Sequence, residues 1–150
     1  MSIFQQDFLM RQIQYLTQLL QQVIFKKNQQ KPKEAIQDIH NAFERLTKDR
    51  PDAFHELSLP DTISIFCRDG NFTSELAAAA ADLLFEEGKM KQKESYSQSQ
   101  KCYAQALLLY RRILKENKAT VPLDISTKID HLTQKLNSDY LHQVNNALKK

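Results

Sequence analysis

The residues best suited to chemistry are histidines and cysteines scattered along the chain. The histidines are His40, His55, His131 and His142. Two of them follow an aspartate by three residues, at Asp52–His55 and Asp139–His142. Di-metal carboxylate proteins place a related pair on inward-facing helices of a bundle. A metal-dependent hydrolase or oxidase built on these histidines is therefore the enzymatic alternative.

The rest of the pattern does not complete such a site. Asp52 and His55 fall in an irregular segment, and His142 flanks an apolar stripe rather than joining it. No inward-facing glutamate is evident from the pattern, and a transition-metal site needs several ligands that converge. We therefore expect no metal site, no catalytic residue and no bound cofactor.

Other catalytic motifs are also missing from the sequence. It has no HExxH, no paired CxxC, no phosphate loop and no nucleophile elbow. Its two glycines are too few to build a loop that cradles phosphate. Cys67 and Cys102 lack motif spacing, which is typical of reduced structural thiols in a cytoplasmic protein. We expect a non-enzymatic protein.

Charge is uneven along the chain, although the net charge is only +3. Acidic residues dominate positions 51–100, and basic residues dominate positions 101–150. The densest basic cluster consists of Arg111, Arg112, Lys115 and Lys118. Phosphate binding would use such charge, so nucleic-acid binding is a further alternative. The neighbouring aromatics, Tyr103 and Tyr110, fall on a core stripe, so we expect a solvated helix surface instead.

Composition favours long helices. The 150 residues contain only two glycines and four prolines, and no β-branched run alternates over strand length. We predict a single all-α domain over residues 1–150, with about six helices in one right-handed array or bundle. No membrane span and no secretory signal are predicted, and we expect a cytoplasmic location.

The central unit is a helical hairpin over residues 72–117. Apolar residues recur every three or four positions from Phe72 to Leu84 and from Tyr96 to Leu114. The run Ala77–Ala81 combines high helix propensity with little bulk, so another helix can approach closely. Asn71 or Thr73 is predicted to cap the first helix, and Ser95 or Ser97 the second. Gly88 either ends the first helix or lies within one more turn.

Further helices flank this hairpin. A long helix over residues 3–27 pairs with a second over 32–49, which Pro32 begins and Pro51 ends. The link 50–71 is predicted to hold one short helix over 60–68, with a Ser58 capping pattern and a stop at Gly70. Residues 124–149 form one helix or two, capped by Asp124 and interrupted at 137–139.

The first turns of the N-terminal helix carry more apolar residues than one stripe needs. Phe4, Phe8, Leu9 and Met10 spread the apolar arc beyond the core face. We expect a homodimer formed through this helix. Alternatively, the link residues Leu59, Ile63 and Phe66 fold back and cover it within one chain.

An internal repeat appears when the chain is shifted by 64 residues. Leu19–Leu20 then aligns with Leu83–Leu84, and residues 35–43 align with residues 99–107. The segments AIQDIHNAF and SQKCYAQAL resemble the second helix of the tetratricopeptide repeat, and Tyr96 is similar to the aromatic residue before that helix. The layout also resembles small all-helical proteins of Gram-positive bacteria that form a domain-of-unknown-function family.

This resemblance implies helical-hairpin packing and a protein-binding role. A tetratricopeptide-like array would use the first helix of each pair on its concave side. The residues expected to contact another protein or peptide are therefore Tyr15, Gln22, Lys26, Glu86 and Lys91, with Phe4 and Phe8 at the dimer contact. We expect a protein–protein interaction or scaffold module.

Overall fold

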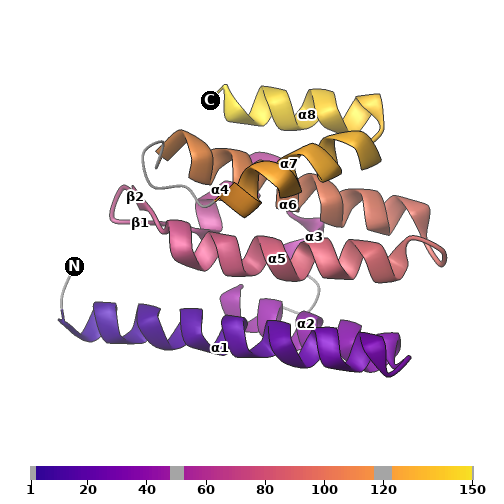
Figure 1. The fold of residues 1–150 in the computed structure, drawn as a ribbon. Helices are drawn as coiled ribbons and strands as arrows, with labels where there is room; N and C mark the ends of the chain where they lie inside the picture. The colour runs from indigo at the N-terminus through magenta and orange to yellow at the C-terminus, as the bar shows by residue number, and fades with distance from the viewer. Residues whose placement is uncertain (1–2, 48–52, 117–122, 150) are drawn as a thin grey trace.

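The chain folds as a stack of helices in a computed structural model that describes residues 3–47, 53–116 and 123–149 (Figure 1). Over these residues the all-α prediction is confirmed, with eight helices and one very short hairpin. The elements are α1 (Ile3–Asn28), α2 (Pro32–Leu46), α3 (Ala53–Glu56), α4 (Leu59–Ile65), β1 (Cys67–Arg68), β2 (Asn71–Phe72), α5 (Ser74–Lys91), α6 (Tyr96–Glu116), α7 (Leu123–Lys135) and α8 (Ser138–Leu148).

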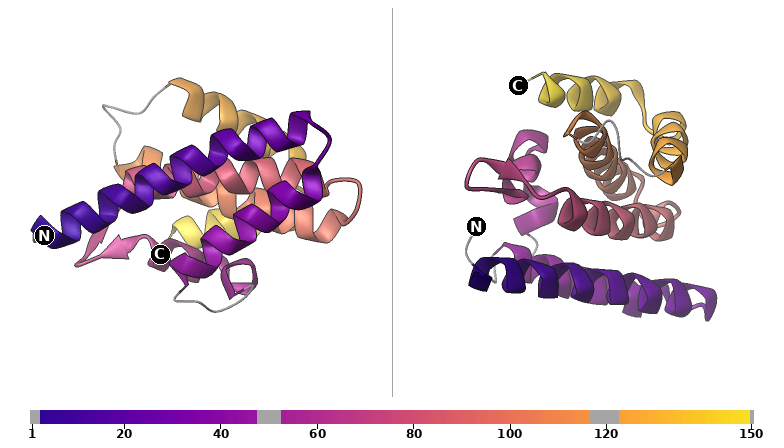
Figure 2. Two further views of the ribbon diagram at one scale, coloured as in Figure 1. Left: turned by 90° about the horizontal axis from the view of Figure 1, so that it is seen from below. Right: turned by 60° about the vertical axis from the view of Figure 1, so that its left-hand side comes forward.

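Helix α5 lies at the centre of the stack. Helices α1 and α2 pack as a pair along one side of the molecule, and α5 rests on them (Figure 1, Figure 2). Helix α6 pairs with α5, and α7 and α8 cover the far side of α6. The buried apolar side chains form one continuous cluster that runs through all these layers.

Four pairs of positions related by the shift of 64 residues are buried in both hairpins. The matched pairs are Ala35 and Ser99, Ile39 and Tyr103, Ala42 and Ala106, and Phe43 and Leu107. Small residues let the paired helices approach, and large residues fill the space beside them. The stripe of α6 is shorter than predicted, because Tyr96 and Leu114 at its ends are exposed.

Gly88 lies inside α5, so its interpretation as a helix end is wrong and the alternative of a further turn to Lys91 holds. A Cβ atom at this position would lie 2.6 Å from two ring carbons of Tyr103. The glycine is therefore required for close approach of α5 and α6. Ser95 caps α6 as predicted, since its Oγ accepts a hydrogen bond from the Gln98 backbone at 3.4 Å.

Helix α5 begins two residues later than predicted, because Phe72 belongs to a hairpin. Asp69 and Gly70 both have positive φ, which suits the tight turn between β1 and β2. Thr73 precedes α5 without a side-chain capping bond. Its hydroxyl instead donates to the Phe66 carbonyl at 2.7 Å, which ties the hairpin to the end of α4.

The prediction for the link is only partly confirmed, because the link holds two short helices and a hairpin instead of one helix. Ser58 caps α4 by accepting a hydrogen bond from the Asp61 backbone, although α4 ends at Ile65 rather than at residue 68. The C-terminal segment is two helices, because the Asn137 side chain caps α8. Asp124 lies within the first turn of α7 and is not its cap. The predicted stop at Pro51 lies outside the described residues.

Candidate functional site

A buried glutamate on α5 is the centre of the candidate site. Glu87 follows Leu83 and Leu84 by four and three residues, so it occupies the face of α5 that points into the protein. Its side chain is 0% exposed. A buried carboxylate is costly unless cations and hydrogen-bond donors surround it. The neighbouring elements supply both.

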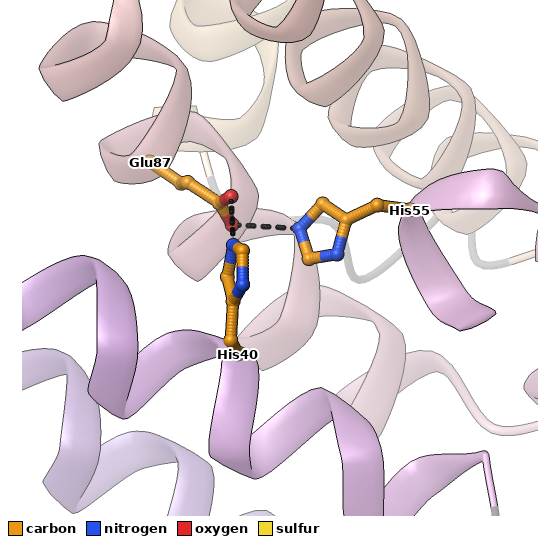
Figure 3. Close-up of side chains that lie close together, drawn as sticks. All are labelled: His40, His55 and Glu87. Carbon is orange, nitrogen blue, oxygen red and sulfur yellow. Dashed lines mark hydrogen bonds and ion pairs between the residues drawn. The ribbon is translucent and has the colours of Figure 1, made fainter. Parts of the chain in front are cut away.

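Three side chains contact the Glu87 carboxylate. His40 Nε2 lies 2.9 Å from Oε2, and His55 Nε2 lies 2.9 Å from Oε1 (Figure 3). Lys91 Nζ, one turn further along α5, lies 2.6 Å from Oε2. The histidines come from α2 and α3, so three separate elements meet at one carboxylate.

Hydrogen-bond chemistry fixes the roles of these groups. His40 Nε2 lies near both the carboxylate, which only accepts, and the Lys91 ammonium, which only donates, at 3.3 Å. One ring nitrogen cannot serve both. We assign its proton to the shorter contact, so His40 donates to Glu87. Lys91 then bonds to the same carboxylate oxygen.

The carboxylate is ionised in this environment. Burial alone raises the pKa of Glu87, but the hydrogen bonds from His40 and His55 and the nearby charge of Lys91 outweigh it. The net result is a pKa well below the usual range. Glu87 therefore carries a full negative charge at neutral pH, balanced locally by the lysine.

Aromatic packing holds the histidines in position. Phe43 of α2 and Phe54 of α3 stack with ring centroids 4.3 Å apart. The His55 ring meets Phe43 edge-on at 5.6 Å, and the His40 and His55 centroids are 4.6 Å apart. The four-residue helix α3 is thereby fixed against α2, and its histidine faces Glu87.

An open pocket of about 380 Å³ lies beside the carboxylate. It is lined by His40, His55, Glu56, Lys91, Gln98 and Lys101. Burial lowers the pKa of Lys101, whose Nζ donates to the Leu57 carbonyl at 2.7 Å. Small solutes or ions can therefore reach both imidazoles from solvent.

Cys102 lies on α6 close to the same carboxylate. Burial raises the pKa of its thiol, and the nearby Glu87 charge raises it further. A neutral, buried thiol is a poor nucleophile, consistent with the predicted structural role. Cys67 is exposed, and both cysteines are free.

A second surface of interest covers the first turns of α1. Its large apolar side chains are strongly exposed, with fractions of 77% for Ile3, 86% for Phe4, 57% for Phe8 and 48% for Met10. Phe4 and Phe8, with Gln5, Arg68 and Asp69, also line an open pocket of about 450 Å³. We call residues 3–11 the N-terminal face.

Leu59, Ile63 and Phe66 of the link do not cover this face. These three residues are buried, but α4, which carries Leu59 and Ile63, packs against α6 and α8. Phe4 and Phe8 stay exposed. The alternative in which the link folds over the first turns of α1 is therefore wrong.

The predicted partner-binding residues separate into different places. Tyr15 and Gln22 line one shallow groove between α1 and α2, and Lys26 pairs with Asp38 on the wall of that groove. Glu86 is paired with lysines of α1 and α5. Lys91 is buried at Glu87 and is not on an outer face with the others.

The basic cluster near the end of α6 is engaged within the protein. Arg111 donates to Asn145, and Arg112 pairs with Glu116. Lys115 donates to the Leu148 carbonyl at 3.4 Å. Lys118 lies outside the described residues.

The sequence interpretation missed Glu87. It found no inward-facing glutamate, yet Glu87 lies on the buried side of α5 between apolar positions. The signal was present, because an acid at that helical position breaks an otherwise apolar face. His40 and His55 reach it from other elements, whereas His131 and His142 are exposed elsewhere.

Comparisons with known proteins give no relative: no family model, no curated protein and no solved structure matches this chain. Among the described helices, none has a stretch long and apolar enough to cross a membrane.

Proposed function

We propose that this chain is a cytoplasmic, non-catalytic protein-interaction module that works as a homodimer through its N-terminal face. One observation carries the proposal: Ile3, Phe4, Phe8 and Met10 are all exposed on the first turns of one helix. The remainder of α1 buries Leu16, Leu19 and Val23 against the protein.

Burial of these apolar side chains in a dimer would stabilise the contact. Burying an isoleucine, phenylalanine or methionine side chain contributes about 1.5–3 kcal/mol. Single exposed apolar residues are ordinary on a protein surface. Here each chain exposes four together, so burying them gains several times the free energy of burying one. Contiguous apolar surface of this kind is typical of an interaction site.

A second copy of the chain is the occupant that the charges favour. Asp7 and Arg11 lie one helical turn apart on the exposed side of α1, among the apolar residues. When two copies pack antiparallel about a twofold axis that crosses α1 midway between these two residues, Asp7 of each chain faces Arg11 of the other. The face is therefore complementary to itself in charge as well as apolar.

The groove between α1 and α2 is the surface that we propose for a different protein partner. Tyr15 and Gln22 line it, and the Arg45 guanidinium lies 4.9 Å from the Tyr15 ring centroid. Aromatic and arginine side chains are enriched at contact surfaces. This groove is separate from the N-terminal face, so both can be occupied at once.

Light scattering after gel filtration tests the dimer. The chain has a mass of 17.5 kDa, so we expect about twice that value at tens of micromolar. The double variant Phe4→Asp with Phe8→Asp should give the monomer mass while keeping its helical circular dichroism. Phe25→Asp is the matched control, because Phe25 is 60% exposed at the other end of α1.

Two results would contradict the proposal. A wild-type mass of 17.5 kDa under these conditions would remove the homodimer. If Phe25→Asp dissociates the dimer equally well, then a charge anywhere on α1 has this effect. The N-terminal face would then not be shown to form the dimer contact.

A further inference from the structure

We propose that His40, His55 and Glu87 form a binding site for a divalent transition-metal ion of the Zn²⁺ type, in which the Lys91 ammonium takes the cation's place when no ion is bound. The three potential ligand atoms come from α2, α3 and α5 and all lie within 4.8 Å of one another (Figure 3). None of these three residues belongs to the N-terminal face, residues 3–11.

The ligand set suits this class of metal. Two imidazole nitrogens and one carboxylate oxygen are the protein ligands of many zinc sites that keep an open position. Imidazole favours zinc, copper, iron and nickel over magnesium or calcium. The chemistry of the ligands therefore selects a transition metal rather than a hard cation.

The distances need only a small adjustment. Zinc–nitrogen and zinc–oxygen bonds of about 2.0–2.2 Å place tetrahedral ligand atoms about 3.3 Å apart. The His–Glu separations of 2.9 Å are slightly shorter, and every separation within the trio is 4.8 Å or less. Rotation of the two imidazole rings can bring their nitrogens to the required spacing.

Both histidines can offer a lone pair without a change in charge. Each Nε2 now points at the carboxylate, and neutral imidazole binds a metal through one nitrogen while the other carries the proton. The protons that His40 and His55 donate to Glu87 from Nε2 would each move to Nδ1 of the same ring when the ion binds, which frees both Nε2 lone pairs. The Glu87 oxygens already face three donors, so they are placed to act as acceptors toward a cation.

Open coordination positions face the pocket. The cavity of about 380 Å³ beside the trio connects it with solvent, and Glu56 and Gln98 lie on its wall. Water or one of these side chains can complete four-coordination. The entry path and the room for further ligands are both features that a metal site needs.

Lys91 explains how the buried carboxylate is satisfied without an ion. Its ammonium is 2.6 Å from Glu87 Oε2 and 3.3 Å from His40 Nε2, so it occupies the position where a cation would contact the same atoms. The lysine side chain also lines the pocket, and its flexible stem can move outward. Metal and lysine therefore compete for one carboxylate.

The test uses the 150-residue chain after a chelator has removed any bound metal. Isothermal titration with Zn²⁺ measures affinity and stoichiometry, and Co²⁺ reports geometry through the visible absorption of tetrahedral cobalt. We expect one ion per chain and a rise in melting temperature with Zn²⁺.

Variants then assign the ligands. Glu87→Gln and His55→Asn keep polar groups of similar shape and should each weaken Zn²⁺ binding at least about tenfold. Lys91→Met removes the competing cation and should tighten binding. His142→Asn, which changes an exposed histidine on α8, is the matched control and should bind as the wild type does.

Three results would overturn the site. The first is a folded wild-type protein that binds no Zn²⁺, and the second is binding that Glu87→Gln and His55→Asn leave unchanged. The third is weaker Zn²⁺ binding by a folded Lys91→Met variant, because Lys91 and the ion would then not compete for the Glu87 carboxylate. Circular dichroism of each variant shows whether it is folded, and Lys91→Met still tests the site when a ligand variant does not fold.

Discussion

The pair formed by Glu87 and Lys91 should show strong energetic coupling in the metal-free protein. The perturbation is Glu87→Gln, which keeps the shape of the side chain and removes its charge. The amide can accept from one histidine and donate to the other, so the hydrogen bonds at both imidazoles survive. What the variant loses is the charge partner of the buried Lys91, whose side chain is 10% exposed.

The magnitude follows from the burial of both partners. Removing one member of a buried ion pair costs about 3–5 kcal/mol. We reduce this to about 2–4 kcal/mol, because Lys91 lines an open pocket and can move its ammonium toward water. Lys91→Met should also destabilise, since Glu87 then keeps its charge with only two histidine donors.

The double variant separates the pair from the rest of the site. Glu87→Gln with Lys91→Met contains no buried charge at this position, so its loss of stability should be smaller than the sum of the single losses. We expect a coupling of about 1–3 kcal/mol, within the range for residues in direct contact. Urea unfolding of the four proteins with a chelator present measures it. A coupling below about 0.5 kcal/mol would refute the view that Lys91 neutralises Glu87.

Two more predictions concern the same part of α5. Gly88→Ala should destabilise the protein by about 1–2 kcal/mol in urea unfolding, because overlap of the new methyl group with the Tyr103 ring costs more than the higher helix propensity of alanine contributes. In a Tyr103→Ala background the same change should stabilise the protein. Stabilisation of the wild type by Gly88→Ala would contradict the close approach of α5 and α6. The free energy of unfolding should also fall as the pH drops below about 4.5, the ordinary pKa of a glutamate, because the pKa of Glu87 is lower in the folded protein and the unfolded chain therefore binds more protons. Glu87→Gln should flatten this pH dependence in chelator-treated protein. An unchanged slope would assign acid unfolding to other groups.

Much of the fold could be predicted because its signals are local. The apolar spacing of α6 predicted the burial of Tyr103 and Tyr110. Pro32 marked the start of α2, and Ser58 marked the start of α4. Each of these residues acts on the backbone within a few positions, so its meaning does not depend on distant parts of the chain.

The errors arose where a distant contact decides a residue's role. Gly88 has the sequence appearance of a helix end, yet its role is set by the Tyr103 ring fifteen residues later. Phe72 fits the spacing of the α5 stripe, but the turn at Asp69 and Gly70 places it in a strand. Helix periodicity alone does not distinguish these cases.

The candidate site was hidden for the same reason. His40, His55 and Glu87 lie on three elements, and no fixed spacing connects them. Contacts between distant parts of the chain, such as the packing of Phe54 on Phe43 and the Gln105 bond to the Phe54 carbonyl, bring the short helix α3 and its His55 to the carboxylate. Sequence patterns reveal metal or ion-pair sites when the ligands share one helix or loop, which these do not.

The alanine run of α5 has a consequence for how that helix is held. Ala77, Ala79, Ala80 and Ala81 are all buried, so α5 presents a smooth rod to its neighbours. Smooth rods gain contact but lack the protruding side chains that stop one helix sliding along another. Polar residues in the C-terminal half of α5 prevent this sliding.

Three acids fix α5 along its axis. Asp82 bonds to Tyr110 and Lys128, Glu86 pairs with Lys27, and Glu87 bonds to the two histidines. These bonds reach α6, α7, α1, α2 and α3. Each of these helices is therefore held at a fixed position along the axis of α5. The alanines determine how closely the neighbouring helices approach α5, and the three acids determine the position of each neighbour along its axis.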